Sequence, residues 1–379
     1  MIDGLSSEQV RGFWAGPGAA MPLVEPIDGT DEVAVTFCWR DAVASQVLLF
    51  ANRLTDETNL ADTLLERLGD TDLWHASFRM RADWRASYSF LVARPGEPAP
   101  WQSADGHVAL RAALDRGLRD PRNPSTCPNR AGIVQSVVAL PDAPPQPWVA
   151  RRRGVARGTV SALPGPARRQ VWVYEPPGGM ADARLPLLIV LDGEVWTGPL
   201  DLPATLDNLH ADGAVAPFRA VFLDSGGRDA RWDELGAGGS GGSYVVEELL
   251  PWLAGIRPVA ADPHGVAVAG QSLGGLAALT IGLSRPDAVG TVISHSASLW
   301  QDDLSAVVTP AAAGLRVWLA HGLQEWVLDA PHRDLATRLR TVGVQVDALP
   351  YNGGHDYACW RGGIADALVS IWGTGLPAR

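Results

Sequence analysis

The stretch Val266-Ala-Val-Ala-Gly270-Gln271-Ser272-Leu273-Gly274-Gly275 decides the fold of this chain. Four small apolar residues lead into a Gly-x-Ser-x-Gly sequence, and a run of small and apolar residues follows. This order predicts a strand that ends in a sharp turn at Ser272, where a helix begins. Gly270 and Gly274 carry no Cβ atom, so the strand and the helix can approach each other closely. A serine lifted out of a sheet in this way is a candidate nucleophile, and the N–H of Leu273 at the helix start suits a developing oxyanion.

The composition limits the classes of function. A chain of 379 residues is expected to form about two domains, and its hydrophobic fraction of 46% is enough to build their cores. The formal charge of −11 argues against a nucleic-acid partner. Three cysteines are too few and too scattered for a disulfide framework or a metal site. Neither a signal peptide nor a membrane-spanning run is recognisable, so we expect a cytoplasmic protein with no membrane partner.

The first 150 residues contain short segments with alternating apolar and polar residues, separated by polar turns. The segments are 33–39, 46–51, 73–80 and 87–92. Such spacing predicts a β-sandwich. Six tryptophans occur here, and we expect most of them in the core. No nucleophile, metal cluster or phosphate-binding loop is recognisable, so the region is predicted to be a binding or scaffold domain.

Longer patterns in this region resemble the amino-terminal domain of the enterochelin (enterobactin) esterase family. They are Phe37-Cys38-Trp39-Arg40-Asp41, Asp72-Leu73-Trp74, Trp84-Arg85-Ala86-Ser87-Tyr88-Ser89-Phe90 and Asp120-Pro121-Arg122-Asn123-Pro124. The resemblance implies an immunoglobulin-like sandwich placed before an esterase domain. Four prolines within 141–147 favour an extended linker, so we place the domain boundary near residue 150.

Residues 151–379 have the pattern of an α/β hydrolase, with a doubly wound and mostly parallel sheet. Continuous apolar runs at 185–191 and 218–223 are typical of strands buried on both faces. The first run ends at Asp192-Gly193-Glu194-Val195-Trp196. The loop after this strand normally supplies the second oxyanion donor, here the N–H of Gly193 or of Glu194. We also predict that Asp192 and Trp196 contact the substrate.

The base and the acid of a catalytic triad are expected after later strands. His355 lies in Tyr351-Asn352-Gly353-Gly354-His355-Asp356, a glycine-rich loop that follows the last predicted strand. This placement and the resemblance of Gly-Gly-His-Asp with Cys359-Trp360-Arg361-Gly362-Gly363 to the esterase family indicate that His355 is the general base. His295 is a competing base, but it comes too soon after Ser272 for the usual order of serine, acid and histidine.

Two acids follow the strand predicted at 315–320. Glu325 and Asp329 are both candidates for the residue that orients the histidine. A Gly-x-x-Glu step at this point resembles the family and favours Glu325, while a site without an acid also stays open.

Arg231 is the predicted cation for an anionic substrate. It lies in Arg231-Trp232-Asp233-Glu234-Leu235, which resembles the Arg-x-x-Glu-Leu stretch of the family. The resemblance implies that this arginine is close to the ester; a surface ion pair with Asp233 or Glu234 is the alternative. The glycine-rich segment 236–243 departs from the family and puts the identity of the substrate in doubt.

The resemblance extends from about Phe13 to Trp372 and implies a serine esterase acting on trilactones of 2,3-dihydroxybenzoyl-serine, with or without iron. It implies no cofactor, because iron arrives with the small-molecule catecholate siderophore and no metal ligand set belongs to the protein. Two other functions stay open: a carboxylesterase or acyltransferase acting on a different ester, and a siderophore-binding protein without enzymatic activity. The oligomeric state does not follow from the sequence.

Overall fold

The computed structural model describes residues 2, 4–102 and 106–375, and the chain forms two compact units. The first unit consists of Met1–Pro144 and Asn352–Cys359, and the second of Pro145–Tyr351 and Trp360–Arg379. The octapeptide 352–359 thus belongs to the first unit, although the predicted second domain, 151–379, includes it. The predicted boundary near residue 150 stays a prediction.

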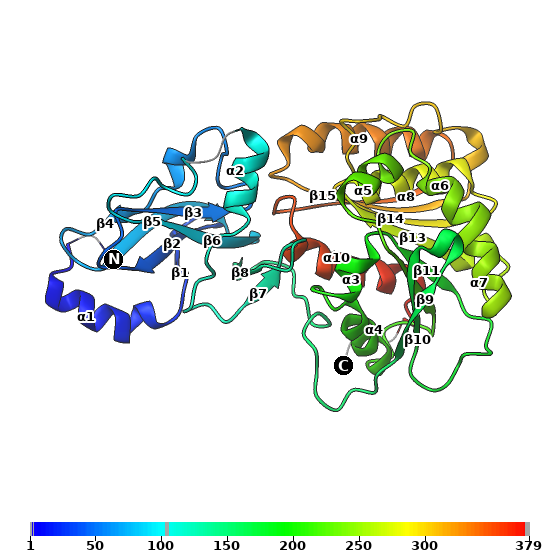
Figure 1. Ribbon diagram of the computed structural model, residues 1–379, viewed down its shortest axis with the longest axis horizontal. Coiled ribbons are helices and arrows are strands. Elements are labelled where there is room, and N and C mark those ends of the chain that lie inside the picture. Colours follow the sequence, from blue (N-terminus) through cyan, green and yellow to red (C-terminus); the bar gives the residue numbers. More distant parts are fainter. Residues whose placement is uncertain (1, 3, 103–105, 376–379) are drawn as a thin grey trace. The chain divides into compact units, whose positions relative to one another are not determined.

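Two antiparallel sheets build the first unit (Figure 1). One has the order β1 (Leu23–Pro26), β2 (Glu32–Arg40), β5 (Leu73–Arg81) and β4 (Glu66–Arg67). The other has the order β3 (Gln46–Ala51), β6 (Arg85–Ala93), β8 (Val134–Ala139) and β7 (Thr126–Pro128). All four predicted strands are present. Two helices, α1 (Ser7–Ala15) and α2 (His107–Leu114), accompany the sheets.

Aromatic and aliphatic side chains fill the core of this sandwich. The core contains Phe37 from β2, Trp74 from β5 and Tyr88 and Phe90 from β6, with the fully buried Trp84 just before β6. Burial of such large apolar side chains is the main force that holds two sheets together. The prediction for the tryptophans is confirmed, because all of the six except the half-buried Trp39 are buried.

An eight-stranded sheet is the centre of the second unit. Its order is β16 (Gln345–Tyr351), β15 (Arg316–Gly322), β14 (Thr291–His295), β13 (Val266–Gln271), β11 (Leu187–Val190), β12 (Arg219–Leu223), β10 (Gln170–Glu175) and β9 (Thr159–Pro164). The six strands from β16 to β12 are parallel, and β10 and β9 are antiparallel additions at one edge. The carboxyl ends of the parallel strands therefore meet at one edge of the sheet, where α/β enzymes carry their sites.

Helices cover both faces of this sheet. Figure 1 shows α7 (Leu250–Ile256), α8 (Leu273–Ser284) and α9 (Trp326–Thr341) on one face, and α3 (Gly193–Thr197), α4 (Leu202–Ala211) and α10 (Tyr357–Trp372) on the other. Every residue of β11, β12, β13 and β14 is buried, as the continuous apolar runs predict. The fold prediction of an α/β hydrolase preceded by a β-sandwich is confirmed.

The helical stretch that begins within the glycine-rich segment 236–243 is divided into pieces. A short turn, α6 (Gly241–Ser243), leads into a π-helical turn at Tyr244–Leu249 and then into α7. Pro251 in the first turn of α7 has no N–H and its ring crowds the preceding carbonyl groups, which accounts for the wider turn before it. In the described part of the chain, none of the helices is both long and apolar enough to cross a membrane.

Candidate active site

Ser272 occupies the sharp turn that the sequence predicts. It separates β13 from α8 and has φ 59° and ψ −120°, a conformation that is costly for a residue with a side chain. A Cβ atom on Gly270 would lie 2.0 Å from the carbonyl oxygen of Gly274, so only glycine permits this turn. Strain of this kind is typical of the nucleophile elbow of α/β hydrolases.

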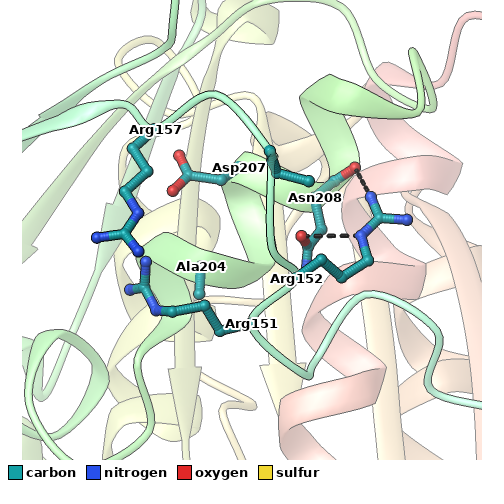
Figure 2. A pocket seen from close by; sticks show the side chains of 7 residues that line it. Arg151, Arg152, Arg157, Ala204, Asp207 and Asn208 are labelled. Atoms are coloured by element: carbon teal, nitrogen blue, oxygen red, sulfur yellow. Dashed lines mark hydrogen bonds between the residues drawn. The ribbon is translucent and has the colours of Figure 1, made fainter.

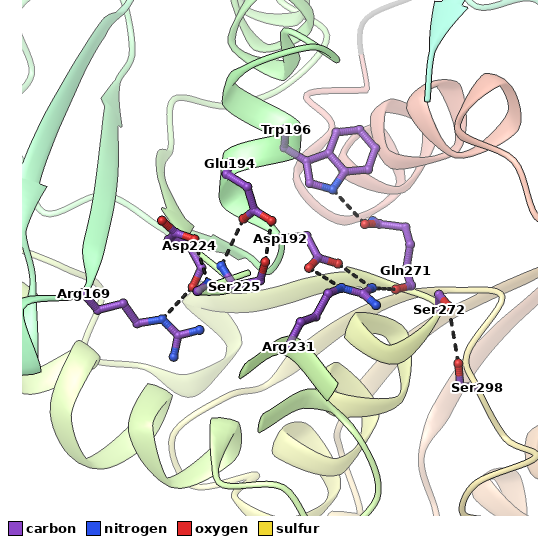
Figure 3. A network of polar contacts seen from close by, with 11 residues as sticks. Arg169, Asp192, Glu194, Trp196, Asp224, Ser225, Arg231, Gln271, Ser272 and Ser298 are labelled. Atoms are coloured by element: carbon purple, nitrogen blue, oxygen red, sulfur yellow. Dashed lines mark hydrogen bonds and ion pairs between the residues drawn. The ribbon is translucent and has the colours of Figure 1, made fainter. Parts of the chain in front are cut away.

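The end of the neighbouring strand β14 holds the elbow in place. The N–H of Ser272 donates to the carbonyl of His295 at 3.0 Å, and the N–H of Ser298 donates to the carbonyl of Ser272 at 3.1 Å. The hydroxyl oxygens of Ser272 and Ser298 lie 3.4 Å apart (Figure 3). The sequence alone had predicted no role for Ser298 beside the nucleophile.

Both predicted oxyanion donors lie at the start of helices. Leu273 is the first residue of α8 and Gly193 is the first residue of α3, and the first N–H groups of a helix have no acceptor within it. A Cβ atom on Gly193 would lie 2.6 Å from the main-chain nitrogen of Leu223, so this position requires glycine. The carboxylate of Glu194 accepts a hydrogen bond from the Ser225 N–H at 3.0 Å and another from its hydroxyl, which fixes α3 to the loop after β12.

Arg231 and Asp192 form a buried ion pair below the elbow (Figure 3). The Nε–Oδ1 and Nη2–Oδ2 distances are 2.6 and 2.8 Å, and the side chains are 12% and 2% exposed. Nη2 also lies 3.5 Å from the carbonyl oxygen of Gln271, the residue before the nucleophile. Arg231 thus pairs with Asp192 and not with Asp233 or Glu234, the alternative partners. The guanidinium group that was predicted to contact the substrate binds the Asp192 carboxylate instead.

Asp192 and Trp196, the predicted substrate contacts, are both buried in this structure, and their contact with the substrate stays a prediction. Asp192 is buried and both of its oxygens accept from Arg231. Trp196 has no exposed surface, and its indole N–H donates to Oε1 of Gln271 at 2.8 Å. Through these hydrogen bonds both residues connect the strand ends around Ser272, as expected of buried polar groups that need partners.

Glu325 lies in a closed polar network after β15. It is 2% exposed, and its Oε2 accepts from the Gly322 N–H at 2.7 Å and from the Ser296 hydroxyl at 2.6 Å. The Ser296 oxygen lies 3.0 Å from both the Tyr351 hydroxyl and the Trp360 indole nitrogen. A carboxylate only accepts, so Ser296 donates to Glu325 and accepts from the two aromatic groups. Ser296 has φ 48°, which again marks strain near the site.

Asp329, the other candidate acid, has different partners. Its Oδ1 lies 2.9 Å from Nε2 of His321, and its Oδ2 lies 2.7 Å from a guanidinium nitrogen of Arg333. The side chain of Asp329 is 22% exposed, on the first turn of α9. These contacts favour a role in fixing the start of α9, whereas the buried Glu325 is linked through Ser296 to the strand that holds the elbow.

His295, the competing base, is enclosed in the protein. Its side chain faces Gly363, and neither ring nitrogen makes a hydrogen bond of ordinary geometry with a described residue. Burial lowers the pKa of His295 to about 4, against the smaller opposing effects of the Gly363 main chain and of the Glu325 charge. A ring that is buried in its neutral form cannot reach a substrate, so the structure argues against His295 as the base.

His355 lies in the octapeptide of the first unit. The residue is half-buried, and its carbonyl oxygen accepts a hydrogen bond from Nδ2 of Asn52 at 2.9 Å. Its neighbour Asp356 is buried. Each of the three predicted triad residues thus follows the carboxyl end of a parallel strand: Ser272 follows β13, Glu325 follows β15 and His355 follows β16.

A small hollow elsewhere in the second unit carries three arginines (Figure 2). Its polar lining is Arg151, Arg152, Arg157, Asp207 and Asn208. Arg151 forms an ion pair with Asp201, and Arg152 binds Asp212 and Asn208. The charges of Arg151 and Arg152 are thus paired. The lining includes no residue of the segments that carry Ser272 or Glu325, so the hollow is not part of the candidate site. Among the residues that the structure describes, no cluster of His, Cys, Asp and Glu side chains could hold a metal ion.

Comparisons with known proteins agree with this architecture. Residues 34–149 match the family "Enterochelin esterase, N-terminal", and residues 165–371 match the family "Putative esterase". The iron(III) enterobactin esterase of Dickeya dadantii is 32% identical over 92% of this chain and 89% of its own length. The iron(III) salmochelin esterase of Escherichia coli is 32% identical over 95% of this chain and 93% of its own length.

A solved structure is similar over the same extent. The Shigella flexneri enterobactin esterase, crystallised in the presence of enterobactin, superimposes with a TM-score of 0.77 and 27% identity, and the match covers 98% of this chain and 99% of that chain. Both regions and nearly the full length are therefore shared with these proteins. On this evidence the chain is an ester hydrolase that belongs to the enterochelin esterase family.

Proposed function

We propose that this protein hydrolyses the ester bonds of a catecholate siderophore trilactone, ferric or iron-free, and so releases iron inside the cell. The observation that carries the proposal is the strained serine elbow in a chain that shares almost its full length with enterobactin and salmochelin esterases. Hydrolysis opens the lactone that holds the catecholates together, which weakens the chelate. The iron is part of the substrate, and the proposal includes no cofactor of the protein itself.

The chemistry assigned to the site is acyl transfer to serine, followed by hydrolysis. His355 accepts the proton of the Ser272 hydroxyl as the oxygen attacks the ester carbonyl, and it then donates this proton to the leaving serine oxygen of the trilactone. In the second half water attacks the acyl-enzyme while His355 accepts its proton, and His355 then donates this proton to Oγ of Ser272 as the bond between the acyl carbon and that oxygen breaks. Each ester consumes one water and yields one carboxylic acid and one alcohol.

Two groups of contacts support this assignment. The N–H groups of Leu273 and of Gly193 or Glu194 would stabilise the oxyanion, and their helix-start positions suit that role. Glu325 would orient His355. Its burial and its tie to Ser296 support that role, because a preorganised carboxylate fixes the tautomer of a catalytic imidazole.

Exposed tryptophans near the elbow support an aromatic substrate. Trp232, Trp300 and Trp326 are 45%, 59% and 78% exposed, and they follow the strands β12, β14 and β15. The rings of Trp232 and Trp300 lie 6.2 Å apart, and Trp300 is two residues after Ser298, which adjoins the nucleophile. We propose that the Trp232–Trp300 pair binds a dihydroxybenzoyl ring, because indole faces stack on aromatic rings and both side chains have free surface.

The cytoplasm is the proposed location. The low cysteine content suits a reducing compartment, where disulfides rarely persist. Release of iron from an imported siderophore would also be useful only after uptake.

The test is an incubation of the protein with ferric and iron-free catecholate trilactones beside simple aryl esters, followed by mass spectrometry. We expect linear products that gain one water for each ester cleaved. Ser272→Ala and His355→Ala should each lose activity by far more than tenfold while the thermal unfolding midpoint stays close to that of the wild type. Turnover of aryl esters but not of trilactones would favour the carboxylesterase alternative, and binding without any turnover would favour a siderophore-binding protein.

A further inference from the structure

The octapeptide Asn352–Cys359 is built into the first unit through contacts with one sheet of the sandwich. At its beginning, the N–H of Arg85 in β6 donates to the carbonyl of Asn352 at 3.1 Å. The side-chain amide of Asn352 donates to Oδ1 of Asp83 at 2.6 Å. At its end, the Cys359 thiol lies 3.5 Å from the carbonyl oxygen of Arg85. Both ends of the octapeptide therefore contact residues at the start of β6.

Asn52 holds the main chain at His355 itself. Asn52 comes directly after β3 and is 8% exposed. Its N–H donates to the carbonyl of Ser87 at 3.0 Å, so the sheet fixes its position. Its Nδ2 donates to the carbonyl of His355 at 2.9 Å. The next residue, Arg53, has φ 61°, and a left-handed conformation at a non-glycine residue costs energy that the surroundings must offset.

Gly354 permits this close approach. A Cβ atom there would lie 2.4 Å from both Cγ of Arg53 and Oδ1 of Asn52. A loop with two adjacent glycines has high conformational freedom by itself. The contact with Asn52 and Arg53 removes that freedom next to the histidine.

Asp356 fixes the other side of the histidine. Its carboxylate is buried, and Oδ2 accepts from the main-chain N–H of Ser87 in β6 at 2.5 Å. Its Oδ1 accepts from the N–H of Ala358 at 2.8 Å, at the start of α10. Charge-assisted hydrogen bonds to a main-chain N–H are among the stronger neutral–ion contacts in proteins. His355 is thus tethered at its own carbonyl and at the next residue, in both cases to groups of the β3–β6 strand pair.

We propose that the amino-terminal sandwich is a positioning element of the reaction, with Asn52 as its principal positioning residue. Asn52 and the Ser87 N–H set the main chain on either side of the general base, so the sandwich contributes to kcat and not only to substrate binding. This inference rests on the role proposed above for His355. A displacement of a catalytic group by about 1 Å can cost on the order of a hundredfold in rate, which gives such tethers their effect.

The test uses full-length variants with the wild type and His355→Ala in the same assays, on a neutral aryl ester and on an iron-free trilactone. Asn52→Ala removes the donor, and Asn52→Asp places an acceptor against the His355 carbonyl. We expect both variants to lower kcat by roughly tenfold or more on both substrates, with KM changed by less than about twofold.

Asn129→Ala is the matched control for Asn52→Ala. Its side-chain amide also donates to a main-chain carbonyl, that of Asp115 at 3.0 Å, in a turn of the same unit. It should change the unfolding midpoint by an amount similar to that of Asn52→Ala and leave kcat unchanged. Gly354→Ala is a second, independent variant, expected to lower kcat in the same way. Gly12→Ala in α1, where a Cβ meets no atom within 4 Å, is its control.

The outcomes separate this inference from the proposed function. An inactive His355→Ala together with an unchanged kcat in the folded Asn52 and Gly354 variants overturns the positioning role alone. A rise in KM restricted to the trilactone also overturns it, because it would make Asn52 a substrate contact. Residual activity of His355→Ala within about tenfold of the wild type overturns the assignment of the base. A wild type that cleaves only aryl esters overturns the proposed substrate, while the kcat comparison on the aryl ester still decides the role of Asn52.

Discussion

The guanidinium group of Arg231 binds both carboxylate oxygens of Asp192, with Nε–Oδ1 and Nη2–Oδ2 distances of 2.6 and 2.8 Å. The pair joins α5 (Arg228–Leu235) to the residue that precedes the proposed oxyanion donor Gly193. Asp192 itself has φ 56°, so the turn before α3 is strained and depends on its contacts. We infer that the pair shapes the oxyanion loop, since little of either side chain is exposed to a ligand.

Arg231→Ala and Arg231→Lys should therefore lower kcat/KM on a neutral aryl ester and on the siderophore by similar factors, roughly tenfold or more. Arg231→Ala should also cost about 3 kcal/mol in the free energy of unfolding, because it leaves the Asp192 carboxylate buried without a partner. Steady-state kinetics and denaturant unfolding would measure both effects.

Arg151→Ala is the matched control, because Arg151 and Asp201 form a similar two-point pair with side chains 41% and 42% exposed. It should cost less than about 1 kcal/mol and leave kcat unchanged. A loss confined to the siderophore in the Arg231 variants would restore the direct anion contact predicted from the sequence. If neither substrate slows, the anion contact should be sought at Arg228 or Arg361.

Glu325→Gln should reduce kcat far more than Asp329→Asn. Glutamine keeps an acceptor for the Gly322 N–H and the Ser296 hydroxyl but removes the negative charge that would stabilise an imidazolium. Asp329 already binds His321 and Arg333, so its loss should affect mainly stability. Kinetics with one aryl ester and thermal unfolding of both variants would check this. The reverse order of the two losses would identify Asp329 as the acid, and full activity of both would indicate a serine–histidine dyad.

Acidification should destabilise the protein partly through His295. Its pKa is lowered from 6.5 to about 4 by burial, so the unfolded state binds the extra proton first. The free energy of unfolding therefore falls as the pH decreases from about 6.5 to about 4, by up to about 3 kcal/mol for this group. His295→Asn, which cannot take up a proton in this range, should show a smaller decrease over the same interval.

His210, whose pKa burial also lowers to about 4, is present in both proteins and serves as an internal reference. Denaturant unfolding between pH 4 and pH 7 measures the difference between the two proteins. A difference that does not vary with pH would contradict the titration of His295.

Trp300→Ala and Trp232→Ala should raise KM for the siderophore by roughly threefold to tenfold and change kinetics on an aliphatic ester little. The reason is that both side chains are exposed and their rings meet at 6.2 Å beside the segment that carries Ser298. Equal losses on aromatic and aliphatic esters would show that the pair supports the loop and does not bind the ring.

Local sequence determined the elements of this protein. Hydrophobic periodicity predicted the strands of both units, and Gly-x-Ser-x-Gly predicted a turn whose strain at Ser272 the structure contains. The reason is that a strand buried on both faces requires an apolar run, and a turn with no room for a Cβ requires glycine. Residues that are neighbours in the sequence meet these requirements, so the strands and the turn can be predicted without knowledge of the tertiary structure.

Tertiary structure alone decided which side chains meet. The sequence predicted that Asp192, Trp196 and Arg231 contact the substrate. In the structure Arg231 binds Asp192 and Trp196 donates to Gln271, because the ends of β11, β12 and β13 bring these residues together. The sequence predicted that the first 150 residues form a binding or scaffold domain without catalytic residues. In the structure Asn52 and Ser87 of this region bind the octapeptide that contains His355. Asn52 and His355 are separated by 303 positions, and no local pattern encodes a hydrogen bond over that distance, since only the packing of the strands defines it.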